Sequence, residues 1–190
     1  EGEFAVQDAG AQHAAPLLAV RDGMRVLDAC AAPGGKATHV AEIAAVDLTA
    51  LDSDEARLAR VRDNFERLRL AGPSVRTVAG DAGAPGAWWD GRGFDRILAD
   101  VPCTASGVVR RHPDAKWLRR RGDVASFGAQ QARILAGLWP LLAPGGRMLY
   151  TTCSVFAAEN ELQIKDFLGR TPSALRESIS FPAGTPHVVE

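Results

Sequence analysis

The chain has 190 residues, of which 46% are hydrophobic and 24% charged, and its formal net charge is −1 at pH 7. This length suits one domain with its own core, and this composition excludes an intrinsically disordered chain. No apolar run approaches the ~18 residues of a membrane-spanning helix, and with a net charge near zero any contact with nucleic acid must come from a local group of cations.

The predicted elements alternate between helices and strands along the chain. Apolar residues at helical spacing predict helices over residues 7–20, 36–43, 58–68, 124–142 and 157–168. Short apolar runs predict strands at residues 24–27, 47–51, 75–79, 94–99 and 147–150. This alternation predicts an α/β fold, a doubly wound and mostly parallel sheet with helices on both faces. Nothing after Thr171 has a strand pattern, so we expect a sheet that lacks a C-terminal strand pair and exposes an edge.

The three cysteines, Cys30, Cys103 and Cys153, lie far apart in the sequence. An odd number without tight spacing argues against a disulfide framework and against a zinc site, so no metal is expected. Free thiols are typical of the reducing cytoplasm, where we expect this protein to act. The chain begins without methionine and without the pattern of a signal peptide, so we expect it to be a piece of a longer protein.

A loop of small residues follows the first predicted strand, where ligands of such sheets bind. It reads Cys30, Ala31, Ala32, Pro33, Gly34, Gly35, Lys36. Small side chains let the backbone approach a ligand, and the next helix offers its free N–H groups. A P-loop would require glycine at position 30 and Ser or Thr at position 37, and a dinucleotide fingerprint would read G-x-G-x-x-G; neither is present. The alternative is an ordinary tight turn.

Carboxylates follow the neighbouring predicted strands. Asp52 ends the second strand, where it can accept both hydroxyls of a ribose, and Asp81 follows the third, where it can accept from an adenine amino group. A lone aspartate at a strand end is more often a helix cap or a turn residue. Because these carboxylates and the small-residue loop follow successive strands, they favour an adenosine pocket that does not depend on contacts with a phosphate.

The fourth and fifth predicted strands both end near a cysteine. Asp100 lies three residues before Cys103, and Cys153 stands in a Thr-Cys-Ser segment. One cysteine in an α/β domain is usually buried filler, but two on one rim of a sheet, one of them beside a carboxylate, are a candidate site. A thiolate that adds to carbon 6 of cytosine makes carbon 5 nucleophilic, and Asp100 could absorb the charge that develops on the ring. The base would have to be unstacked or flipped out.

These segments resemble the motifs of RNA cytosine-5 methyltransferases of the Nol1/Nop2/Sun family: residues 30–36, 100–103 and 152–154. The segment 107–120 is similar to the bacterial Sun branch, which methylates one cytosine of 16S ribosomal RNA. The resemblance covers residues 4–170. It implies a Rossmann-like class I fold that depends on S-adenosylmethionine. Members of this branch also carry an N-terminal helical RNA-binding domain, so we expect residues 1–190 to be the catalytic domain alone.

The resemblance also implies a role for each matching residue. Cys153 would be the nucleophile, and Cys103 would help to release the product. Asp52, Asp81 and Asp100 would contact the cofactor, Asp100 being shared with the base. The methionine and ribose end of the cofactor would be lined by Cys30, Ala31, Ala32, Pro33, Gly34, Gly35 and Lys36.

A run of cations directly follows the Cys103 segment: Arg110, Arg111, Lys116, Arg119, Arg120 and Arg121, with Trp117 among them. Most charge runs are solvated surfaces. Here the position beside the candidate thiols favours contacts with phosphates that flank the target base of ribosomal RNA. Two other hypotheses stay open: a methyltransferase that acts on another RNA position or a small molecule, and a non-catalytic RNA-binding fragment.

Overall fold

The computed structural model describes residues 2 and 4–179. Its five strands form one sheet in the order β3-β2-β1-β4-β5, and every neighbouring pair is parallel. The strands are β1 (Arg25–Asp28), β2 (Asp47–Asp52), β3 (Val75–Ala79), β4 (Phe94–Asp100) and β5 (Leu142–Thr151). The predicted doubly wound parallel sheet is confirmed. Because the chain runs outward through β2 and β3 and then returns to the other side of β1, the switch point lies between β1 and β4.

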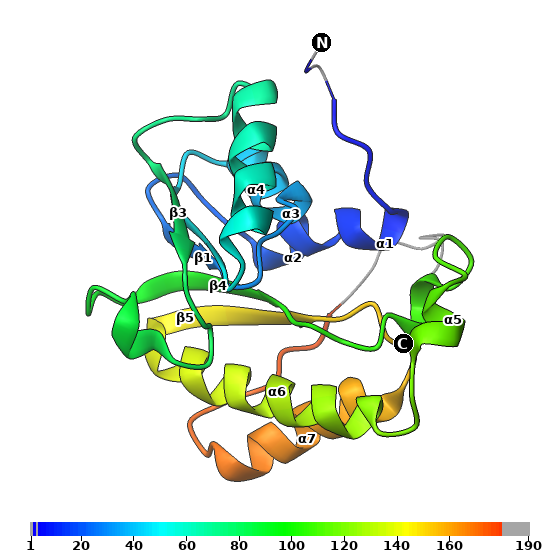
Figure 1. Ribbon diagram of the computed structural model, residues 1–190. Coiled ribbons are helices and arrows are strands. Elements are labelled where there is room, and N and C mark those ends of the chain that lie inside the picture. Colours follow the sequence, from blue (N-terminus) through cyan, green and yellow to red (C-terminus); the bar gives the residue numbers. More distant parts are fainter. Residues whose placement is uncertain (1, 3, 180–190) are drawn as a thin grey trace.

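Helices cover both faces of the sheet (Figure 1). One face carries α2 (Ala14–Leu18), α3 (Gly35–Ile43) and α4 (Glu55–Arg67), and the other carries α6 (Asp123–Leu138) and α7 (Glu161–Arg170). Two further short helices are α1 (Ala9–Gln12), which contacts α2 and α3, and α5 (Ala115–Leu118), which lies to the side of both layers (Figure 1). Single 3-10 turns are η1 (Pro85–Ala87), η2 (Ser106–Val108), η3 (Trp139–Leu141) and η4 (Ala157–Glu159).

Each face of the sheet has its own apolar core. Val26 of β1 packs with the helices α2 to α4, whereas its neighbour Leu27 points to the opposite core, which includes Ile134 and Leu138 of α6. Successive side chains of a strand point to opposite faces, so a strand covered on both sides must be apolar along its whole length. All four residues of β1 are buried, which holds the loop at its carboxyl end in one place.

The structure differs from the predicted helices at two prolines. The expected helix over residues 7–20 is divided into α1 and α2, because a continuous helix would need an N–H at Pro16 for the carbonyl of Gln12. α2 instead places Pro16 in its first turn, where no N–H is required. The helix expected to reach residue 142 ends at Leu138, and Pro140 stands in the 3-10 turn that follows.

The fifth strand is longer than predicted and contains an irregular turn. Leu142 pairs with Phe94, and the next paired residues are Arg147 and Arg96, so residues 143–146 form an irregularity within the strand. Gly145 has a φ of 77°, the left-handed region that glycine adopts without cost. Among the described residues β5 pairs with β4 alone, so β5 is one edge strand of the sheet. The tail beyond residue 179 lies outside the described residues. No helix in the described part of the chain is long and apolar enough to cross a membrane.

Candidate active site

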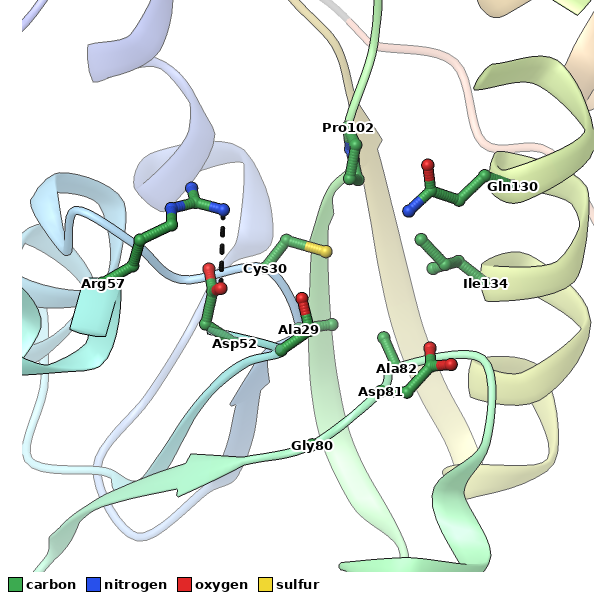
Figure 2. Close-up of a pocket in the computed structure, with 11 residues that line it drawn as sticks. Ala29, Cys30, Asp52, Arg57, Gly80, Asp81, Ala82, Pro102, Gln130 and Ile134 are labelled. Atoms are coloured by element: carbon green, nitrogen blue, oxygen red, sulfur yellow. Dashed lines mark hydrogen bonds and ion pairs between the residues drawn. The ribbon is translucent and has the colours of Figure 1, made fainter. Parts of the chain in front are cut away.

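A pocket lies beyond the carboxyl ends of β1 to β4, beside the switch point of the sheet, and α6 closes its far side (Figure 2). The loops after the strands supply most of the lining, and α4 and α6 supply the rest: Ala29, Cys30, Asp52, Ser53, Arg57, Gly80, Asp81, Ala82, Pro102, Gln130 and Ile134. The structure therefore brings together three of the predicted cofactor residues, Cys30, Asp52 and Asp81, from three successive strand ends.

Asp52 is buried at the end of β2 and held by several donors. Its Oδ2 accepts from the backbone N–H of Ala32 at 3.1 Å, and its Oδ1 accepts from the N–H of Asp54 at 3.1 Å. The guanidinium of Arg57 lies 3.4 Å from the same Oδ1 and also donates to the carbonyl of Ala32 at 3.0 Å. A carboxylate offers about four acceptor positions, so a ligand hydroxyl can still bind this fixed group.

Asp81 lies on the opposite side of the pocket and reaches toward α6 (Figure 2). Its Oδ2 is 2.6 Å from the guanidinium of Arg133, and its Oδ1 accepts from the N–H of Gly83 at 2.8 Å. The hydrogen bond from Arg133 holds the pKa of Asp81 below its usual value. The ion pair ties the loop after β3 to α6, a contact that the sequence pattern did not reveal.

The small-residue loop is held closely between β2 and α4. The N–H of Ala31 donates to the carbonyl of Leu51 at 2.8 Å, and that of Gly34 donates to the carbonyl of Ala31 at 2.7 Å. Gly34 has a φ of 106°, and a Cβ at this position would lie 3.2 Å from the Cα of Val61 on α4. Both the backbone conformation and the close packing therefore require glycine here. Gly35 then begins α3, which presents Lys36 in its first turn.

Asp28, the last residue of β1, is a buried carboxylate without a hydrogen-bond partner for either oxygen among the described residues. Burial, followed by repulsion from Asp100, raises its pKa to about 7. Buried polar groups are almost always paired, so these two oxygens are positioned for donors that a ligand would supply. Asp28 ends β1 just as Asp52 ends β2, but no role was predicted for Asp28 from the sequence.

Lys36 and Asp100 form an ion pair between the small-residue loop (residues 30–36) and the end of β4. The Lys36 Nζ lies 2.6 Å from the Asp100 Oδ2, and the Thr151 hydroxyl donates to the Asp100 Oδ1 at 2.8 Å. The pair is partly exposed, with 22% and 30% of the two side chains accessible. It therefore joins the ends of β4 and β5 to the first turn of α3 and leaves charge available to a substrate.

The sulfurs of Cys103 and Cys153 lie 3.4 Å apart, and either can donate the hydrogen bond between them. Cys103 is buried, whereas Cys153 is exposed. The hydrogen bond lowers the pKa of Cys103 to about 7 and raises that of Cys153, because the two sulfurs share a proton and a second ionisation would place two anions side by side. The pair therefore holds one thiolate near neutral pH.

The third thiol, Cys30, has a different environment. Burial, together with the neighbouring carboxylates of Asp28 and Asp52, raises its pKa. A thiol that resists ionisation is a poor nucleophile but a suitable apolar wall for a pocket. The structure thus separates the three cysteines into one that lines the pocket and two that face each other at the rim.

The basic run lies on and around α5, next to the Cys103 loop. Arg119 donates its Nε–H to the carbonyl of Thr104 at 2.6 Å, and its guanidinium stands 5.3 Å from the centre of the Phe127 ring. Arg111 forms an ion pair with Asp8. Trp117 is 81% exposed. The run is therefore not uniform, because Arg119 supports the Cys103 loop and Arg111 is paired, whereas the tryptophan is open to a partner.

The parallel sheet and the pocket at its switch point define a Rossmann-like, class I S-adenosylmethionine-dependent methyltransferase. The model of the family described as 16S rRNA methyltransferase RsmB/F matches residues 15–187, and the chain belongs to that family.

Individual relatives agree with this assignment. The ribosomal RNA small subunit methyltransferase B of Vibrio cholerae serotype O1 is 51% identical over 175 residues, which are 92% of this chain and 40% of the relative. The protein of the same name from Salmonella paratyphi B is 51% identical over 183 residues, which are 96% of this chain and 42% of the relative. The chain thus spans about two fifths of the length of these curated relatives.

Solved structures give the same result. The crystal structure of NSun6 from Pyrococcus horikoshii with SFG superimposes with a TM-score of 0.80 and 29% identity, covering 89% of this chain and 43% of that one. A methyltransferase homolog protein from Pyrococcus horikoshii has a TM-score of 0.73 and 32% identity, covering 87% of this chain and 51% of that one.

Proposed function

We propose that this chain is the catalytic domain of an enzyme that transfers a methyl group from S-adenosylmethionine to carbon 5 of a cytosine in 16S ribosomal RNA, of the cytosine 967 type. The observation that carries this proposal is the approach of the Cys103 and Cys153 sulfurs to 3.4 Å. Membership of the family and the names of its relatives support ribosomal RNA as the substrate. The free thiols support a cytoplasmic location.

We expect the cofactor that this class of enzyme uses to bind in this pocket, whose lining includes three of the predicted cofactor residues. Asp52 would accept the ribose hydroxyls, and Asp81 would accept from the adenine amino group. The loop from Cys30 to Lys36 would face the methionine and ribose end, which carries an ammonium group. The buried, unpartnered carboxylate of Asp28 suits that positive charge. When bound, the cofactor supplies an electrophilic methyl group on a sulfonium sulfur.

The two thiols divide the chemistry of the base. Cys153 passes the shared proton to Cys103 and, as a thiolate, forms a bond to carbon 6 of the cytosine. This makes carbon 5 nucleophilic, and carbon 5 would then take the methyl group that the cofactor supplies. The Lys36–Asp100 pair would stabilise the charge that develops on the ring. With Cys153 bonded to carbon 6, Cys103 releases the shared proton to water; as a thiolate it then accepts the proton from carbon 5, and the bond between sulfur and carbon 6 breaks to regenerate the Cys153 thiolate. We assign the addition to Cys153 because it is the exposed residue of the pair and stands in the Thr-Cys-Ser segment that resembles the motif of the family.

Replacing each thiol tests this division of roles. We expect Cys153→Ala to abolish methyl transfer and to form no covalent protein–RNA adduct, because no other thiol at the rim is exposed to the base. We expect Cys103→Ala to add to the base and then stall, so that an adduct resistant to denaturing gels accumulates. The measurements are transfer of labelled methyl groups to 16S ribosomal RNA and gel mobility of the protein.

The control is calorimetric binding of S-adenosylmethionine to both variants, which should match the parent chain because neither thiol lines the cofactor pocket. An adduct in Cys153→Ala together with none in Cys103→Ala would assign the nucleophile to Cys103. Methyl transfer that survives both substitutions would overturn the covalent route and favour another RNA position.

A further inference from the structure

Glu159 is a fully buried carboxylate at the end of η4. Its Oε1 accepts from the backbone N–H of Thr104 at 2.9 Å and from the side chain of Gln131 at 3.2 Å. Its Oε2 accepts from the hydroxyls of Thr104 and Ser154, each at 2.5 Å. A buried carboxylate is tolerated only when such donors replace water, and here donors surround both oxygens.

Two of the three residues that donate to this carboxylate are the immediate neighbours of the two thiols. Thr104 follows Cys103 and Ser154 follows Cys153. The two cysteines belong to loops after β4 and β5, and fifty positions separate them in the sequence. One oxygen atom, the Oε2 of Glu159, therefore links the two loops one residue away from each sulfur.

The carboxylate is itself fixed from several sides. The Tyr150 hydroxyl donates to the backbone carbonyl of Glu159 at 2.7 Å, and the N–H of Glu159 donates to the carbonyl of Phe156 at 3.0 Å. Gln131 of α6, which donates to the carboxylate, also donates to the carbonyl of Pro102 at 2.9 Å. The bridge thus connects the Cys103 loop, the Cys153 loop and α6 within one network.

We propose that Glu159 is a positioning residue that clamps the two cysteine loops together and so keeps the Cys103 and Cys153 sulfurs within hydrogen-bond distance of each other. The inference rests on the proposed function for its purpose, since the two thiols must reach one base in the same turnover. It concerns the geometry of the thiol pair, which can be measured without RNA and without the cofactor.

The first test measures how closely the thiols approach. In a buffer of reduced and oxidised glutathione, the two thiols reduce one glutathione disulfide to two glutathione thiols and form one Cys103–Cys153 disulfide, and the equilibrium gives the effective concentration of one thiol at the other. A disulfide requires sulfurs at ~2.05 Å, so the equilibrium is sensitive to separation of the loops. We expect Glu159→Ala to lower the effective concentration at least about tenfold, the worth of the lost charge-assisted hydrogen bonds.

Conservative variants separate clamping from a general effect on folding. Glu159→Gln keeps the shape, its carbonyl oxygen can replace Oε1, and its amide can donate to the two hydroxyls, which then act as acceptors. We therefore expect it to restore an effective concentration close to that of the parent chain. Ser154→Ala removes one arm of the bridge and should lower the value less than Glu159→Ala does, which keeps the test valid if the latter does not fold. The matched control is Glu161→Ala, since Glu161 pairs with Arg176 on the surface.

The second test is the pH dependence of the alkylation of Cys103 by iodoacetamide. The hydrogen bond from Cys153 is the main cause of the lowered pKa of Cys103. If Glu159→Ala separates the sulfurs, the midpoint of alkylation should rise from near 7 toward the value of an ordinary thiol, about 8.5. A residue that only stabilised the fold would change the melting temperature and leave this midpoint in place.

Unchanged effective concentration together with an unchanged alkylation midpoint in folded Glu159→Ala would overturn the proposal. So would a loss in Glu161→Ala as large as that in Glu159→Ala. These results are independent of the methyl-transfer assay. If that assay showed that Cys153 is not the nucleophile, the approach of the two thiols and its dependence on Glu159 could still be measured.

Discussion

At the scale of single residues, Asp28 shows how burial changes the pKa of a side chain. Its carboxyl group has a pKa of about 7 in the folded chain, against the ordinary value of 3.8. Between these two values the unfolded chain has lost the proton that the folded chain keeps. The folded state then binds more protons, so its stability should fall as the pH rises from about 4 to about 7, and change little with Asp28 above that.

Asp28→Asn should remove this pH dependence in the absence of cofactor. Because an amide of the same shape carries no charge to bury, the variant should exceed the parent chain in unfolding free energy at pH 8, by at most about 4 kcal/mol, and approach it at pH 4. Urea unfolding at several pH values measures the difference. Asp63→Asn, an exposed change on α4, is the control and should retain the slope of the parent chain. The same slope in Asp28→Asn would contradict the assignment of a neutral buried carboxyl group.

At the scale of elements, the loop after β4 and the loop after β5 approach each other at Gly107 of η2. Its N–H donates to the carbonyl of Cys153 at 2.9 Å, and a Cβ at this position would lie 2.8 Å from that carbonyl oxygen. Real Cβ atoms do not approach an oxygen so closely, so any side chain here must push the Cys153 loop away from η2. The site is therefore built on a contact between two backbones rather than between side chains alone.

Gly107→Ala should therefore displace the nucleophile while leaving the sheet intact. We expect methyl transfer to fall by about one to two orders of magnitude, since a shift near 1 Å can cost ~100-fold in rate. Circular dichroism and thermal unfolding should differ little from those of the parent chain, because Gly107 is exposed. Gly122→Ala is the matched control, with no atom within 4 Å of the added Cβ. Equal rates for both variants would show that the loop contact does not position Cys153.

At the scale of the whole molecule, the distribution of charge matters more than its sum. The formal net charge is −1, yet six cations fall between Arg110 and Arg121 beside the thiol pair. Long-range attraction of RNA to the protein as a whole is therefore weak, and binding should depend on this one region. The exposed ring of Trp117 within it could stack on an unpaired base.

The salt dependence of RNA binding tests this localisation. Each phosphate contact with single-stranded RNA contributes about 0.7 to the slope of log affinity against log salt concentration. The double change Arg110→Gln and Arg120→Gln should reduce the slope by about 1.4. Fluorescence anisotropy with a labelled fragment of 16S ribosomal RNA measures it. Arg170→Gln, at the end of α7, is the control and should leave the slope unchanged. An equal loss in the control would point to general charge attraction instead.

The sequence by itself determined the class of fold and the edge of the sheet at which the site lies. Sequence patterns predicted the five strands, the small-residue loop and the residues after each strand, because apolar periodicity and turn residues are local properties. Parallel strands also place all their carboxyl ends on one edge of the sheet. Helix ends were misplaced at Pro16 and Pro140, and the last helix begins at Glu161 rather than at residue 157. The two errors at the prolines concern which N–H groups can reach a carbonyl.

The tertiary structure alone decided how the site residues combine. The order of the strands, the ion pair of Lys36 with Asp100, the 3.4 Å approach of the two sulfurs and the unpartnered carboxylate of Asp28 all depend on how distant segments come together. Glu159 has no distinguishing pattern in the sequence, since its role arises from hydroxyls that the fold brings to it. Residue types and their spacing are encoded locally, whereas distances, burial and shared protons are properties of the packed chain.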